Sequence, residues 1–124
     1  MIRKELCKTL AGNRQDLLQI TARGTSEEVA ARKGVVITAR IHPGESNSSF
    51  IMKGVIDFLT SDDSPEAHLL RNNFVFNLVP MINIDGVICG NYRTSLSGMD
   101  LNRKWKNPSQ SLFPEIFYLK RQIS

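Results

Sequence analysis

A histidine and a glutamate stand three positions apart in the hexapeptide RIHPGE, residues 40–45. Zinc accepts imidazole nitrogen and carboxylate oxygen as ligands, and a catalytic zinc keeps three protein ligands and one open position for water. Pro43 and Gly44 favour a turn over a continuous helix. A tight turn can direct His42 and Glu45 at one point, so the spacing predicts a shared metal ion. A surface His and Glu beside an ordinary turn remains an alternative, because so short a pattern is common.

The segments on either side of this turn predict a strand before it and a helix after it. Residues 34–39 are a nearly continuous apolar run, typical of a central strand covered on both faces. Residues 48–60 have helical apolar spacing, and Ser46, Asn47 or Ser48 can cap that helix. The face expected to pack on the sheet consists of Ile51, Val55, Phe58 and Leu59, widened by Met52 and Ile56. Open α/β sheets bind ligands at the carboxyl ends of their strands, where this turn would lie.

The rest of the chain predicts further strands and helices in alternation. Strands are expected at residues 17–22 and 74–79, and helices at 65–71, with Ser64 as cap and Pro65 in the first turn, and at 112–123. Residues 1–16 could be helical or loop-like, and loops or turns are expected at 23–33, 81–87 and 90–98. This order predicts an α/β fold with a mixed, largely parallel sheet and flanking helices. The sheet would be thin, so residues 1–124 are expected to form the front part of a larger, truncated domain, with 1–16 as the tail end of a preceding segment.

Composition narrows the class of protein. The chain has 124 residues, 41% of them apolar and 23% charged, which is typical of a globular protein with one small domain. The formal net charge of +4 is spread along the chain, which predicts no nucleic-acid partner and only weakly favours anionic ligands. Cys7 and Cys89 lack metal or redox spacing and are expected to be free thiols in a reducing compartment. Neither a signal peptide nor a membrane-spanning run is visible, so a cytosolic location without membrane contact is expected.

Three spaced blocks then carry a family resemblance. They are ARIHPGES at residues 39–46, VPMINIDGV at 79–87 and GNYRTSLSGMDLNRKW at 90–105, followed by FPEIFYLKRQI at 113–123. This ordered set resembles the M14 zinc carboxypeptidases, and within them the cytosolic carboxypeptidase branch that trims glutamates from tubulin tails. The resemblance implies a zinc carboxypeptidase-like fold, a Zn²⁺ cofactor, acidic protein C-terminal tails (tubulin among them) as partners, and a cytoplasmic location, with microtubules or cilia as associated structures.

The resemblance also implies roles for five residues. His42 and Glu45 would be two of the three zinc ligands. Arg93 would polarise the scissile carbonyl and stabilise the oxyanion, and Asn102 with Arg103 would bind the terminal carboxylate of the substrate. A guanidinium group binds a carboxylate through two hydrogen bonds, and a fixed cation stabilises a growing oxyanion, so the chemistry suits these roles. Composition alone would make the arginines solvated surface residues and Asn102 a cap.

Two departures from the family pattern stand out. Ile84 replaces a proline that is usual in the family. The third zinc ligand of the family is a downstream histidine and the general base a later glutamate, but the only other histidine here, His68, does not match and is expected on a helix surface. Asp85 is expected to be structural, and Asp100 to order a loop.

Three functions follow from these observations. The first is a metallocarboxypeptidase that removes C-terminal or branch glutamates from acidic protein tails. The second is a catalytically inactive, truncated or spliced product that at most binds such tails. The third is another zinc amidohydrolase, such as an aspartoacylase-like deacylase, although the block around Arg93 favours the peptidase branch. The oligomeric state cannot be inferred from the sequence.

Overall fold

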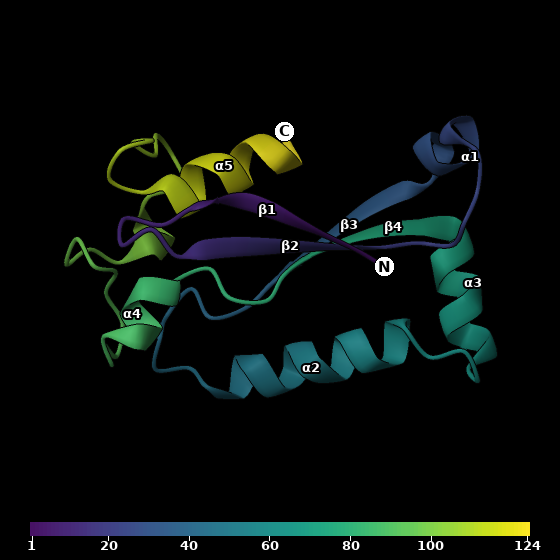
Figure 1. Ribbon diagram of the computed structural model, residues 1–124, viewed down its shortest axis with the longest axis horizontal. Helices are drawn as coiled ribbons and strands as arrows, with labels where there is room; N and C mark the ends of the chain where they lie inside the picture. The colour runs from purple at the N-terminus through teal and green to yellow at the C-terminus, as the bar shows by residue number, and fades with distance from the viewer.

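A computed structural model describes residues 1–124 as a four-stranded sheet between helices (Figure 1). The strands are β1 (Ile2–Lys8), β2 (Arg14–Ile20), β3 (Lys33–Thr38) and β4 (Phe74–Val79). The helices are α1 (Ser26–Ala31), α2 (Asn47–Leu59), α3 (Pro65–Asn73), α4 (Ile84–Ile88), α5 (Pro114–Ile123) and the short 3₁₀ helix η1 (Leu101–Arg103). The predicted mixed α/β fold is therefore confirmed.

The sheet has the strand order β1-β2-β4-β3. β1 pairs antiparallel with β2, and β2 pairs antiparallel with β4. Only β3 and β4 are parallel, in a register that sets Val35 opposite Phe76. The sheet is therefore mixed, as predicted, but the prediction that it is largely parallel was wrong, because the hairpin of β1 and β2 adds two antiparallel pairings. The crossover between these two strands contains α2 and α3, as a parallel connection requires.

The core lies in two layers, one on each face of the sheet. Side chains alternate along β4, so Phe76 and Leu78 face α2 while Val79 faces α5. Figure 1 shows α2 along one side of the strands and α5 across β1 and β2 on the other. On the α5 side the buried cluster consists of Leu17, Val79, Ile82, Leu101, Phe113, Ile116 and Leu119. β4 is therefore an interior strand that is covered on both faces.

Several local predictions need correction. Residues 2–8 are a strand and not a helix or loop, because β1 completes a hairpin with β2 and packs under α5. β3 is an edge strand with Val36 39% exposed, so the prediction of a central strand at residues 34–39 was wrong. A continuous apolar run cannot by itself distinguish an edge strand from a buried one. Short helices α1 and α4 also form where a loop and a turn were expected, each begun by a polar cap, Thr25 and Asn83.

Helix α2 has the predicted extent but a shifted apolar face. Met52 and Leu59 are buried, whereas Ile51 and Phe58 are 65% and 44% exposed. Met52 and Leu59 pack in one buried cluster with Phe76 and Leu78 of β4, so the buried stripe of α2 lies one position further along the helix than predicted. Ser46 occupies the cap position without a capping side-chain hydrogen bond, contrary to expectation. The hydroxyl of Ser48 instead donates to the Glu45 carbonyl, 2.7 Å away.

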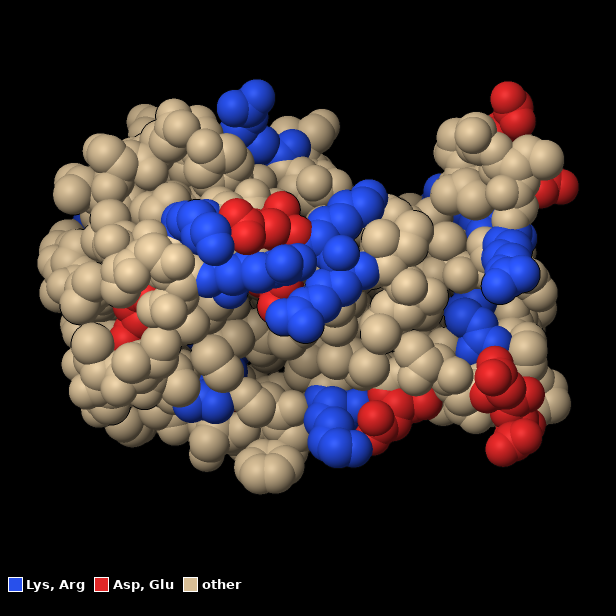
Figure 2. Space-filling view, viewed as in Figure 1, with Lys and Arg blue, Asp and Glu red and all other residues tan.

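Charged side chains are mixed in sign on the surface. Figure 2 shows Lys and Arg gathered over the middle of one face with Asp and Glu among them. On β1 and β2, Arg3 and Arg14 both form ion pairs with Asp16 at 2.6 Å. No helix has the length and apolarity that crossing a membrane requires.

Two buried ionisable groups lie between the hairpin and α5. The first is Cys7. Burial, together with the negative charges of Glu115 and Glu5, raises the pKa of its thiol to about 12. Cys7 is a free thiol, as is the exposed Cys89, and both were predicted to be free. Glu115, which is 2% exposed, is also affected by burial. Burial, opposed by a hydrogen bond to its own backbone and reinforced by the charge of Asp85, raises the pKa of Glu115 to about 7.

Candidate active site

The candidate site lies at the carboxyl ends of the parallel strands β3 and β4, where the sequence predicted it. Arg40, the second residue after β3, has a φ of 53°, a left-handed conformation that is rare for a residue with a side chain. Its guanidinium group donates to the Pro43 carbonyl from Nε at 3.0 Å and from Nη2 at 2.6 Å, and from Nη1 to the Ser49 hydroxyl at 2.9 Å. The side chain therefore closes the turn that its own backbone begins.

The segment after β4 holds this turn from the other side. The Ile82 amide donates to the Ala39 carbonyl at 2.9 Å, and the Asn83 amide to the Arg40 carbonyl at 3.0 Å. The fully buried Asn83 side chain accepts from the Gly86 amide at 3.0 Å and donates to the Ile41 carbonyl at 3.3 Å. One asparagine thus caps α4 and fixes the chain just before His42.

His42 and Glu45 face each other across the turn. His42 Nδ1 lies 3.0 Å from Glu45 Oε1, and His42 Nε2 lies 3.1 Å from Asp100 Oδ1. Both neighbours of the ring are carboxylates, which only accept hydrogen bonds when ionised. A neutral imidazole has one proton and cannot serve both. With the single ring N–H directed at Asp100, the lone pair of Nδ1 faces the Glu45 carboxylate, and a cation between Nδ1 and Glu45 would satisfy both.

This geometry fits a metal ion. If Asp100 fixes the proton on Nε2, the lone pair on Nδ1 is free to bind a metal. Two ligand atoms of a tetrahedral zinc, at bond lengths of about 2.0–2.2 Å, lie about 3.3 Å apart. The 3.0 Å between His42 Nδ1 and Glu45 Oε1 is close to that separation. No group of three or more His, Cys, Asp or Glu side chains that could hold a metal is present, so the chain offers two zinc ligands.

Asp100 connects the metal-ligand turn to the predicted substrate-binding residues. Oδ1 accepts from His42 Nε2 at 3.1 Å and from the Asn102 amide at 2.8 Å. Oδ2 accepts from Arg93 at 3.0 Å, through Nε and Nη2. Burial raises the pKa of Asp100. The hydrogen bonds from Asn102 and His42 and the charge of Arg93 outweigh burial and hold that pKa below its ordinary value. Asp100 does order a loop, and it also brings three of the five predicted site residues together.

Two glycines let the loop that carries Arg93 approach the turn. A Cβ on Gly44 would lie 2.5 Å from the Tyr92 ring and 2.8 Å from the Tyr92 carbonyl oxygen. That carbonyl accepts from the Gly44 amide at 2.8 Å. A Cβ on Gly86 would lie 2.5 Å from Pro43 Cγ and 2.7 Å from the Thr94 carbonyl oxygen. Only a residue without a side chain allows these close approaches.

The predicted carboxylate-binding residues lie on η1, which Asp100 caps through its hydrogen bond to the Asn102 amide. Asn102 and Arg103 are both exposed, and Arg103 Nη1 lies 3.5 Å from the Asn102 carbonyl oxygen, too long for a strong hydrogen bond. The guanidinium group is therefore available to a ligand. His68, by contrast, is exposed on α3 as predicted, bonded to the Asp62 carbonyl and to Arg71.

Sequence reasoning missed three contributors to the site. Arg40 was counted only as the end of a strand, and Asn83 only as part of a turn. Trp105, whose indole donates to the Asn102 side chain at 2.9 Å, was noted only as the last residue of the block at 90–105 and was given no role. An asparagine immediately before an apolar residue, with an acidic residue in the first turn as Asp85 is here, is a signal for the Asn83 cap. Nothing in the sequence indicated the conformation of Arg40.

Comparison with known proteins agrees with this arrangement. The family model for the zinc carboxypeptidase family, peptidase M14, matches residues 2–116. Cytosolic carboxypeptidase 2 of Mus musculus is 55% identical over 121 residues, covering 97% of this chain and 14% of that protein. Cytosolic carboxypeptidase 4 of Homo sapiens is 54% identical over 121 residues, covering 93% of this chain and 11% of that protein. The chain thus spans only a small part of these relatives.

Solved structures show the same fold. A metallo-carboxypeptidase from Burkholderia cenocepacia superposes with a TM-score of 0.89 at 33% identity, covering 98% of this chain and 32% of that one. A metallo-carboxypeptidase from Pseudomonas aeruginosa, in complex with (2-guanidinoethylmercapto)succinic acid, superposes with a TM-score of 0.86 at 30% identity, covering 98% and 32%. On the family match and these likenesses, the chain belongs to the zinc carboxypeptidase family.

Proposed function

We propose that this chain supplies part of a zinc carboxypeptidase active site that removes C-terminal or branch-linked glutamates from acidic protein tails, such as those of tubulin. The observation that carries the proposal is the junction at Asp100. One carboxylate contacts the candidate metal ligand His42, the candidate oxyanion residue Arg93 and the backbone of the candidate carboxylate-binding residue Asn102.

Each side chain has a chemical role in this proposal. His42 and Glu45 would hold zinc, which when bound supplies a Lewis acid and an activated water for peptide hydrolysis. Arg93 uses Nε and Nη2 for Asp100, which leaves Nη1 to donate to a carbonyl oxygen as negative charge grows on it. Asn102 and Arg103 present N–H donors to the terminal carboxylate of the substrate, and a guanidinium group can bind both of its oxygens.

Three observations favour glutamate and protein tails as the substrate. The similar proteins are named cytosolic carboxypeptidases, and the chain has a formal net charge of +4, which favours acidic partners. The Pseudomonas relative was solved with a succinic acid derivative, a compound with two carboxyl groups. We propose the cytoplasm, at microtubules or cilia, as the place of action.

The test is release of glutamate from a polyglutamylated peptide by the 124-residue chain, with and without added zinc. We expect zinc-dependent release that is lost in His42→Ala and in Arg103→Ala. His68→Ala is the matched control, because it removes the other histidine of the chain, which lies exposed on α3. Equal release by wild type, His42→Ala and Arg103→Ala would refute the proposal.

A second candidate function is binding of acidic tails without hydrolysis. It is favoured by the absence of a three-ligand metal group in the chain. With two ligands and no general base from this chain, a bound water would have no group to accept its proton. A binding measurement with the same peptide, made beside the release assay, separates the two functions: peptide binding that depends on Arg103, without release of glutamate, would support the second.

A further inference from the structure

Trp105 determines which end of the Asn102 side chain faces solvent. Its indole Nε1–H donates to Asn102 Oδ1 at 2.9 Å. An indole nitrogen can only donate a hydrogen bond, so its partner must be the oxygen of the carboxamide and not the NH₂ group. The NH₂ group of Asn102, with two donors, is consequently the end left for a ligand.

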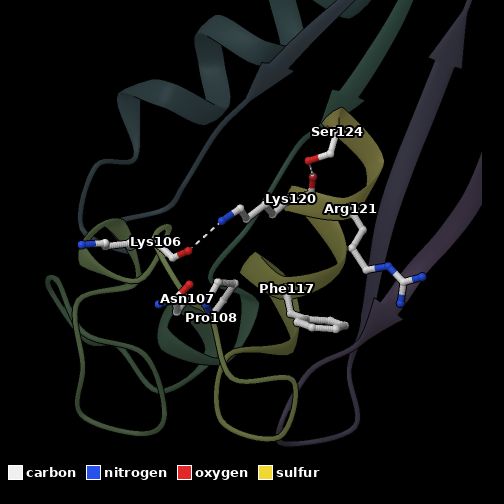
Figure 3. Close-up of a pocket in the computed structure, with 7 residues that line it drawn as sticks. All are labelled: Lys106, Asn107, Pro108, Phe117, Lys120, Arg121 and Ser124. Carbon is white, nitrogen blue, oxygen red and sulfur yellow. Dashed lines mark hydrogen bonds between the residues drawn. The ribbon is translucent and has the colours of Figure 1, made fainter.

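Trp105 is itself held in place from two sides. Its partly buried ring packs against the core cluster that contains Phe113 and Leu101. Lys120 on α5 donates from Nζ to the Trp105 carbonyl at 2.9 Å and to the Lys106 carbonyl at 2.7 Å. Figure 3 shows the pocket beside α5 that Lys106, Lys120 and Arg121 help to line, with Lys120 reaching toward Lys106. Lys120 therefore fixes the loop that carries Trp105 to α5.

This fixed orientation has a consequence for ligand choice. With its oxygen occupied, Asn102 offers only donors to a ligand, and the exposed Arg103 beside it also offers only donors. A carboxylate has acceptors alone and satisfies both residues. A primary amide also carries an NH₂ group, which would face donors at one of its ends.

We propose that Trp105 is a positioning residue that holds the Asn102 amide with its NH₂ group toward the substrate and so sets a preference for a free C-terminal carboxylate over a C-terminal amide. The choice of a C-terminal carboxylate as the ligand rests on the proposed function. The orientation of Asn102 follows from its hydrogen bond with Trp105 alone. Without the indole N–H, the amide is free to turn over and offer its oxygen to an amide ligand. The preference for the free acid over the amide should then fall about three- to tenfold, which corresponds to the loss of one hydrogen bond.

The experiment measures binding of two labelled peptides of six glutamates, one a free acid and the other a C-terminal amide, to the full 124-residue chain. The peptides differ at the terminus alone, so the ratio of their Kd values reports terminal recognition. The variants are Trp105→Phe, Asn102→Ala and the double variant. Tyr118→Phe is the matched control, because the Tyr118 hydroxyl accepts from Gln110 Nε2 at 2.9 Å and so also joins an aromatic residue to a carboxamide, outside the proposed carboxylate site.

We expect Trp105→Phe to lower the preference for the free acid about three- to tenfold, and Tyr118→Phe to leave it unchanged. In the Asn102→Ala background, Trp105→Phe should cause no further change, because Trp105 acts through Asn102. An unchanged preference in Trp105→Phe, or an equal fall in both backgrounds, would overturn the inference. The second result would indicate a general effect on packing.

If the proposed function is wrong, the binding experiment gives a result that differs from a failure of the Trp105 inference. If the wild-type chain binds neither peptide, the proposed ligand is wrong, and the orientation of Asn102 is tested without ligand. The chain has a single tryptophan, so its indole N–H gives one assignable NMR signal. That proton should move upfield in Asn102→Ala when its acceptor is lost. No movement would overturn the inference.

Discussion

Asp85 is buried at the junction of α4 and the β1–β2 hairpin, and its replacement tests how the site is supported. The side chain is 2% exposed and accepts three hydrogen bonds from the hairpin turn. Thr9 Oγ1 and Asn13 Nδ2 donate to Oδ1 at 2.7 and 2.9 Å, and the Ala11 amide donates to Oδ2 at 3.0 Å. Asp85→Asn keeps the shape but converts one acceptor into a donor.

The cost can be worked from these contacts. If the Asn oxygen stays toward Thr9 and Asn13, its NH₂ group faces the Ala11 amide, which then loses its acceptor. If the amide turns over, two hydrogen bonds are lost instead. A buried unpaired donor costs about 1–3 kcal/mol, and hydrogen bonds to a charged group contribute about 1.5–3 kcal/mol each without simple additivity. We therefore expect Asp85→Asn to lower the free energy of unfolding by about 2–4 kcal/mol.

Urea denaturation monitored by circular dichroism measures this loss. With a slope of about 1–3 kcal/mol per molar urea for small proteins, the midpoint should fall by at least about 0.7 M. Asp57→Asn is the control, because Asp57 pairs with Lys53 on the exposed face of α2 and its loss should cost less than about 1 kcal/mol. If Asp85→Asn moves the midpoint no further than Asp57→Asn, then Asp85 does not hold the hairpin to α4.

Three further predictions concern the core and the site. Glu115 has a pKa raised to about 7 in the folded state from an ordinary 4.5, so stability should fall as pH rises from about 4.5 to 7, by at most about 3 kcal/mol. Glu115→Gln should flatten that slope in urea melts at several pH values; an unchanged slope would contradict the assignment. Gly44→Ala must displace Tyr92 and should cost about 1–3 kcal/mol in thermal melts, whereas an unchanged Tm would show that the loop yields freely. Asp100→Asn loses the fixed His42 tautomer and should weaken zinc binding about 10–100-fold by calorimetry, and equal affinity would show that Asp100 does not orient the ring.

The sequence predicted most of the fold because its strongest signals are local. The apolar spacing of residues 112–123 predicted α5, and Ser64 with Pro65 marked the start of α3. What it could not supply was pairing between distant strands. β1 is polar and mostly exposed on its own, and it becomes a strand because it pairs with β2 and lies under α5.

In the candidate site, too, the local features were predictable from the sequence and the contacts between distant residues were not. The turn at His42 and Glu45 was predictable, since turn residues lie between two residues that can bind metal. The connection through Asp100 was not, because Asp100 follows His42 by 58 positions and the two meet only in the folded chain. Trp105 was missed for a related reason: a tryptophan three residues after an asparagine has no distinctive pattern until the 3₁₀ turn of η1 brings their side chains together.

The most direct test of the account is a zinc titration of the 124-residue chain by isothermal calorimetry, with His42→Ala and Glu45→Gln measured beside the wild type and His68→Ala as control. The account predicts saturable binding of one zinc ion, weakened at least about tenfold in both site variants and unchanged in His68→Ala. Binding that is identical in His42→Ala and wild type, or that is lost in His68→Ala instead, would contradict the assignment of His42 and Glu45 as the metal ligands.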